Sequence, residues 1–143
     1  MAAIVNEATV GGGFGNQINY ARVTYDFAVD GGATGALDLF TAGAGGVVIL
    51  DARLVVKTAA TSAGSATLKW GPSADDDRFC NTTQGAVASL TANAVIVPPA
   101  LEGTPNVIAT PYYLAAASKL IMTIGTAALT AGKIEFVIGY MKA

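Results

Sequence analysis

The densest group of chemically capable side chains is a run of three carboxylates, Asp75, Asp76 and Asp77, followed by Arg78. Calcium takes about six to eight oxygen ligands, and carboxylates are common donors. The spacing of an EF-hand loop is missing, and consecutive side chains on an extended backbone point in opposite directions. We therefore interpret the run as a solvated loop tip rather than a calcium site, which stays the alternative, and we expect no metal and no cofactor.

Other side chains could support acid–base or nucleophilic chemistry. Four carboxylates fall in predicted strands: Asp26, Asp38, Asp51 and Glu135. A glycosidase needs two of them in one cleft, but each is explained as a polar-face residue beside Arg22, Arg53 or Lys133. The sequence holds no histidine, which removes the Ser-His and Cys-His relays and most zinc chemistry. The single Cys80 is predicted to be a buried or semi-buried free thiol, and we expect no enzymatic activity.

The glycine-rich run at residues 11–15 is only superficially similar to a phosphate-binding loop. Asn16 or Ile18 stands where the dinucleotide motif requires its third glycine, and no Gly-Lys-Ser/Thr follows. Because glycine frees the backbone, we interpret residues 1–19 as a flexible N-terminal arm. Residues 20–143 are then the folded domain.

The composition restricts the partners. The chain has 143 residues, of which 52% are hydrophobic and 13% charged, with eight Lys/Arg against ten Asp/Glu. It lacks the clustered positive field of a nucleic-acid binder, so we expect no direct contact with nucleic acid. A membrane span needs about 18 consecutive apolar residues, and the richest run, residues 46–50, ends at Asp51. We expect no membrane association and no signal peptide, and apolar faces covered by other copies or partners.

Apolar residues recur at every second position in several segments, which is the period of a strand with one buried face. These segments are residues 23–29, 48–57, 66–70 and 134–140, and residues 120–124 are apolar enough to be buried on both sides. Turn signals containing glycine occur at residues 30–32, 41–43, 62–64 and 130–132. Residues 84–90 could form one helical turn. Short strands at this spacing predict an all-β sandwich or barrel.

A long stretch without charge indicates a buried contact between subunits. Between Phe79 and Ser118 the only charged residue is Glu102. The centre of a protein interface is depleted of charge and enriched in aromatic residues, such as Tyr112 and Tyr113. We hypothesise that the apolar faces of residues 86–99 and 107–114 form an intersubunit contact.

Residues 21–33, ARVTYDFAVDGGA, resemble the opening strand and turn of a family of small virion proteins from tailed bacteriophages. Residues 61–68, TSAGSATL, and 126–133, TAALTAGK, resemble it too. The similarity runs from about Ala21 to Tyr140 and includes no catalytic motif. The family is that of head decoration, or cement, proteins. The resemblance implies a single-domain antiparallel β-sandwich, jelly-roll-like, that sits as a homotrimer on the threefold positions of a capsid.

The function that the resemblance implies is mechanical. The chain would be a structural virion protein on the capsid surface, assembled in the host cytoplasm, whose partners are further copies of itself and the major capsid protein. Joined weak contacts reinforce one another through their effective concentration, and an arm can add a strand to an exposed sheet edge. We expect Ile4, Val5 and Phe14 of the arm to engage the capsid or an adjacent copy, and Tyr112 and Tyr113 to lie at the contact between subunits.

The alternative is a receptor- or carbohydrate-binding module of a phage tail or fibre. It would use Trp70, Tyr112 or Tyr113 as stacking surfaces beside the acidic run. Trp70 ends a predicted strand next to Gly71, however, and is more simply explained as a residue of the hydrophobic core.

Overall fold

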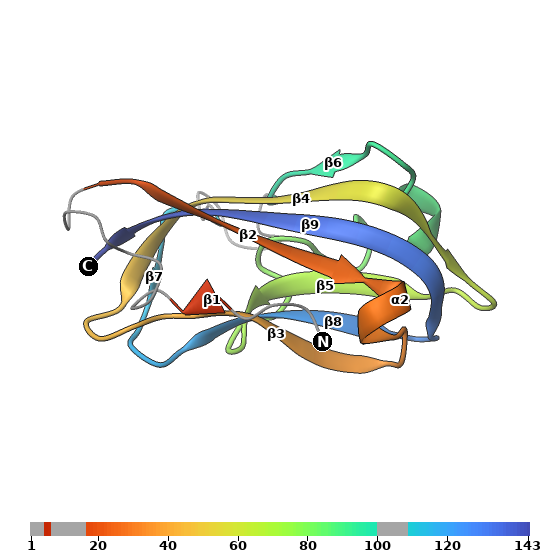
Figure 1. Cartoon of the computed structure of the whole chain (residues 1–143), viewed down its shortest axis with the longest axis horizontal. Coiled ribbons are helices and arrows are strands. Elements are labelled where there is room, and N and C mark those ends of the chain that lie inside the picture. Colours follow the sequence, from red (N-terminus) through yellow and green to blue (C-terminus); the bar gives the residue numbers. More distant parts are fainter. Residues whose placement is uncertain (1–4, 7–16, 100–108) are drawn as a thin grey trace.

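Two β-sheets face each other in a computed structural model of the chain, which describes residues 5–6, 17–99 and 109–143 (Figure 1). The first, sheet A, has the strand order β1 (Val5–Asn6), β3 (Gly35–Thr41), β8 (Lys119–Gly125), β5 (Thr67–Pro72). The second, sheet B, has the order β2 (Asn19–Asp26), β9 (Leu129–Lys142), β4 (Val47–Ser62), β6 (Val95–Ile96), and β7 (Tyr112–Leu114) also pairs with β4. The helical elements of the described residues are α2 (Phe27–Asp30) and η1 (Val87–Ser89).

The strands pair as in a long hairpin that has been rolled up. Strand β2 pairs with β9, β3 with β8 and β4 with β7, all antiparallel, so that early strands pair with late ones in nested order. The connections from β2 to β3, β3 to β4, β4 to β5 and β8 to β9 each change sheets. This is the strand order of a jelly roll. The predicted antiparallel β-sandwich is confirmed. Among the strands in the described ranges, β1 is the exception, because it runs parallel to β3.

The core lies between the sheets and is centred on aromatic rings. Trp70 is fully buried, with ring centroids 5.1 Å from Phe79 and 5.0 Å from Phe136. Phe40 of sheet A meets Tyr140 of sheet B edge to face at 5.2 Å. Such edge-to-face pairs add to the stabilisation from burial itself. Trp70 is therefore a core residue as predicted, and its use as a stacking surface for a sugar is excluded.

Strand β4 contains a bulge that reverses which residues face the core. Val47 and Ile49 are fully buried, whereas Val48 and Leu50, which the alternating pattern had placed inside, are only half-buried. The register with β9 shifts between Ile49 and Asp51, because a bulge inserts one extra residue into the strand. Beyond it the buried positions are Ala52, Leu54 and Val56, as predicted.

Strand β2 ends earlier than the pattern predicted. The Asp26 carboxylate accepts a hydrogen bond from the Ala28 N–H and so caps the helical turn α2. Gly31, with φ of 74°, ends that turn, and its carbonyl accepts a 2.6 Å hydrogen bond from the Tyr25 hydroxyl. Val29, predicted to lie in the strand, is instead 72% exposed.

Two further predictions need correction. Residues 130–132 form no turn but belong to β9, where Gly132, with φ of 141°, lies against Ala60 and the register with β4 is irregular. Residues 120–124 are not buried on both sides, because Ile121 and Thr123 of β8 are only half-buried. The single helical turn expected within residues 84–90 is present as η1. In the described part of the chain, no helix is long and apolar enough to cross a membrane.

The edge of β5 is covered by the loop that follows it. The Leu68 N–H donates to the Gly85 carbonyl at 2.8 Å, and the Phe79 N–H donates to the Trp70 carbonyl at 3.0 Å. The Val87 N–H donates to the carbonyl of Ala66, just before the strand, at 3.0 Å. These bonds occupy edge groups that would otherwise be free to pair with another chain.

Candidate interaction surface

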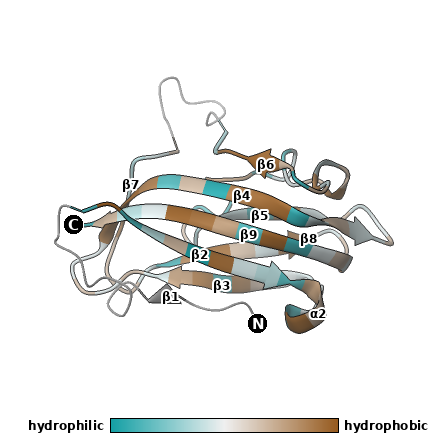
Figure 2. Cartoon of the chain, turned by 45° about the horizontal axis from the view of Figure 1, so that its top comes forward, coloured by the Kyte–Doolittle hydropathy of each residue, from teal (hydrophilic) through white to brown (hydrophobic). Residues whose placement is uncertain are grey.

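The outer face of sheet B carries the main candidate surface. Residues whose side chains alternate with the buried positions of β2, β9 and β4 point outward, and the strand register aligns them in transverse rows. One row consists of Arg22, Val137 and Arg53. The next consists of Thr24, Glu135, Val55 and Val95. In Figure 2, hydrophobic and hydrophilic residues alternate along β4, and the hydrophobic β6 lies beside it.

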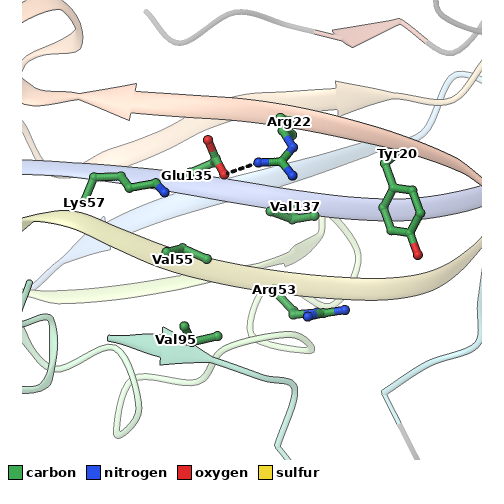
Figure 3. Close-up of a pocket in the computed structure, with 8 residues that line it drawn as sticks. All are labelled: Tyr20, Arg22, Arg53, Val55, Lys57, Val95, Glu135 and Val137. Carbon is green, nitrogen blue, oxygen red and sulfur yellow. Dashed lines mark hydrogen bonds and ion pairs between the residues drawn. The ribbon is translucent and has the colours of Figure 1, made fainter. Parts of the chain in front are cut away.

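These rows line a shallow depression with a volume of about 420 Å³. Its lining comes from four strands and comprises Tyr20, Arg22, Arg53, Val55, Lys57, Val95, Glu135 and Val137 (Figure 3). Val55 and Val137 are half-buried, while Val95 is 57% exposed. The depression therefore combines an apolar centre with charged side chains around it.

The charges around the depression are only partly balanced. Arg22 Nη1 lies 3.0 Å from Glu135 Oε1, and Arg53 Nε donates to both oxygens of Asp51 at 3.0 Å. The hydrogen bond from Arg53 to Asp51 and the charge of that carboxylate raise the pKa of Arg53 above its ordinary value. Lys57 is exposed, and among the described residues it takes part in no ion pair. The lining itself thus holds three cations and one carboxylate.

One wall of the depression depends on a missing side chain. A Cβ at Gly139 would lie 2.9 Å from Tyr20 Cε1 and 2.9 Å from Asp51 Cβ. Glycine at this position allows the Tyr20 ring to lie across β9, as aromatic rings do over glycines in sheets. Tyr20 remains 58% exposed. Sequence reasoning missed Tyr20, because only the pairing of Tyr20 with Gly139 indicates its position.

The two tyrosines predicted to share an interface point in opposite directions. Tyr113 pairs with Val48 and faces outward, with 57% of its surface exposed, and its hydroxyl donates to the Gly45 carbonyl at 3.3 Å. Tyr112 is half-buried: its ring lies 6.5 Å from that of Phe79 and beneath the Arg78 guanidinium at 4.5 Å. Tyr113 is therefore available to a partner, while Tyr112 mainly contributes to the fold.

The predicted arm residues are only partly described. Ile4 and Phe14 lie outside the described residues. Val5 belongs to β1, where it pairs in parallel with Phe40 of β3. The backbone of residues 5–6 thus occupies part of an edge of sheet A.

The acidic loop, residues 73–78, leaves one carboxylate without an ion pair. Asp75 pairs with Arg78 at 3.2 Å, and Asp76 pairs with Lys69 at 3.0 Å. Asp77 is exposed and has no ion-pair partner within residues 17–99 and 109–143. Desolvation, together with the hydrogen bond and charge of Asp75 and the charge of Asp76, raises the pKa of Asp77 above its ordinary value. Within the same ranges, no three His, Cys, Asp or Glu side chains are grouped so that they could hold a metal ion.

The strand order and the outward apolar residues define a jelly-roll β-sandwich with a candidate interaction surface on sheet B. Comparison with solved structures finds a similar fold. No protein-family model matches the chain, and no curated protein matches it. A solved structure described as the cyanophage Pam1 capsid asymmetric unit contains a similar chain, with a TM-score of 0.59, 17% identity, and coverage of 93% of this chain and 90% of the other. At this identity the similarity shows a common fold.

Proposed function

We propose that the chain is a structural, non-enzymatic virion protein of a bacteriophage that decorates and stabilises the capsid. The observation that carries this proposal is the fold shared, over 93% of this chain, with a protein of a cyanophage capsid asymmetric unit. In the proposal the chain lies on the capsid surface as a homotrimer, after assembly in the host cytoplasm. Each copy contacts sister copies and the major capsid protein.

The exposed apolar side chains support a role in association. The large hydrophobic residues that are more than half exposed are Ile18, Tyr20, Val29, Val95, Val97 and Tyr113. Three of them, Tyr20, Val95 and Tyr113, lie on the outer face of sheet B. Burying apolar surface contributes about 25 cal/mol per Å², so covering this face by neighbouring proteins stabilises an assembly.

Cementing requires weak contacts that act together. A capsid presents many identical sites, and the contacts of a trimer are joined, so that each one raises the effective concentration of the next. The rigid sandwich supplies fixed spacing between these contacts. Residues 1–19 serve in the proposal as an arm that reaches the capsid or a neighbouring copy through Ile4, Val5 and Phe14.

Labelling the chain in purified particles tests this function. Particles from the cells that produce the chain are treated with an antibody against it, imaged, and analysed for copies per particle. We expect label over the whole head surface and a copy number that is a multiple of three. Label confined to tail or fibre, together with binding of the isolated chain to a glycan array, would contradict decoration and support the carbohydrate-binding alternative.

A further inference from the structure

We propose that the depression on the outer face of sheet B binds the acidic loop of a second copy of this chain. The inference deepens the proposed function, on whose homotrimer it rests, by naming the two surfaces that meet. The depression is lined from β2, β9, β4 and β6, and the acidic loop is residues 73–78.

The depression offers a positive charge with no partner in its own chain. Arg22 and Arg53 are paired with Glu135 and Asp51, whereas Lys57 joins no ion pair in the described ranges. Counting Asp51 with the lining gives three cations against two carboxylates, a net charge of +1. An anionic occupant fits this balance.

The acidic loop offers the complementary group. Asp75 and Asp76 pair with Arg78 and Lys69, and Asp77 is exposed with no ion pair among the described residues. Asp75, Asp76 and Asp77 against Lys69 and Arg78 give a net charge of −1. The two surfaces therefore carry opposite net charges, each with one charge that its own chain leaves unpaired.

The loop is already held in a compact form. The Asp75 N–H donates to the Pro72 carbonyl at 2.9 Å, and the Arg78 N–H donates to the Asp75 carbonyl at 3.1 Å. Arg78 Nε also donates to the Ala109 carbonyl at 2.9 Å. A loop fixed in this way loses little conformational entropy on binding.

The placement of the two surfaces requires different copies. The loop follows β5 of sheet A, whereas the depression lies on the outward face of sheet B, so one molecule does not bring them together. A contact between two different surfaces is heterologous and generates a closed ring when the rotation between copies closes. A three-membered ring of this kind is a homotrimer. Contact with the exposed Val95 and Tyr20 would add apolar burial to the charge pair.

Charge reversal tests the contact. Lys57→Asp and Asp77→Lys are made separately and together, and the mass of each full-length protein is measured by light scattering over a concentration series. We expect each single variant to raise the dissociation constant of self-association about tenfold or more, since an attraction becomes a repulsion. The double variant should recover most of this loss. Ser65→Asp, which adds a negative charge at an exposed position between β4 and β5, should leave the constant within about twofold of the wild type.

The results of this experiment test the contact separately from the proposed role in capsid decoration. A monomeric wild type, or single variants that assemble normally, would overturn the contact, even where labelled particles support decoration. A loss caused by Lys57→Asp but not by Asp77→Lys would mean that the depression binds another segment, and would overturn it too. Recovery in the double variant supports the contact whether or not the particles carry the label.

Discussion

Burial alone decides the chemistry of Cys80, the single thiol of the chain. Its side chain is fully buried, as predicted, and desolvation raises the pKa of the thiol from an ordinary value of 9.0 to about 12. The nucleophilic form of cysteine is the thiolate. Near neutral pH the folded protein therefore keeps Cys80 as an inert apolar side chain.

The raised pKa of Cys80 predicts a loss of stability at alkaline pH. The unfolded chain releases the thiol proton near pH 9 while the folded chain retains it, so the contribution is complete below about pH 9 and is lost as pH rises towards about 12. We expect the urea midpoint to fall between about pH 8 and about pH 10.5, and to fall less in Cys80→Ala. Burial also raises the pKa of Tyr25 to about 12. Part of the fall of the urea midpoint with pH therefore remains in both proteins. Equal slopes would contradict the assignment.

Residues in the core could be predicted from the sequence, whereas the residues around the depression could not. The burial of Trp70 follows from the alternation within its own strand, and the burial of Cys80 follows from its own hydrophobicity. The contact of Arg22 with Glu135 and the position of Lys57 near Val95 depend on the register of four strands. That register joins segments far apart in the chain, and no local pattern specifies it.

At the scale of elements, the same limit explains the errors in strand phase. The alternation in β4 is correct from Ala52 onward and wrong before it, because the bulge adds one residue between Ile49 and Asp51. Because the added residue, Leu50, is apolar like its neighbours, the sequence does not show where the bulge lies. Similarly, residues 130–132 carry a glycine that is typical of a turn, but the partner strand β4 continues beside them and keeps them in β9.

The covered edge of β5 supplies a prediction about a single loop residue. A Cβ at Gly85 would lie 1.6 Å from the Leu68 carbonyl oxygen, a backbone atom that cannot move aside alone. In Gly85→Ala the loop must therefore leave the edge and lose the hydrogen bond from the Leu68 N–H. We expect the free energy of unfolding to fall by roughly 2–4 kcal/mol, and the Leu68 amide to exchange faster with solvent.

A second substitution in the same loop controls for general disturbance. Thr83 is exposed and its backbone N–H, not its side chain, binds Asn81 Oδ1. Thr83→Ala should change the free energy of unfolding by no more than about 0.5 kcal/mol. If Gly85→Ala were as stable as the wild type, with Leu68 still protected, the loop would not be the cover of this edge.

At the scale of the whole molecule, the structure shows which side chains of the predicted association surface are exposed. Residues 79–118, whose only charged residue is Glu102, do contain exposed apolar side chains, namely Val95, Val97 and Tyr113. Its other predicted contact residue, Tyr112, turns inward because neighbouring residues of a strand face opposite sides. The charged part of the outer face comes from β2, β9 and β4 and lies outside that stretch. Only the pairing of these strands in the sheet brings its charges together.

The proposed arm gives the prediction that separates folding from attachment. Strand β1 pairs with β3 through two residues, Val5 and Asn6, whereas the sandwich closes through β2–β9, β3–β8 and β4–β9 without it. Deleting residues 1–15 should therefore leave the urea midpoint nearly unchanged, while binding to particles that lack the chain falls about tenfold or more, because the contacts through Ile4, Val5 and Phe14 are lost. Both are measured on the same preparation, by urea titration and by co-sedimentation. Full occupancy after the deletion would show that the arm is not needed for attachment. Loss of folding would show that the folded domain includes some of residues 1–15.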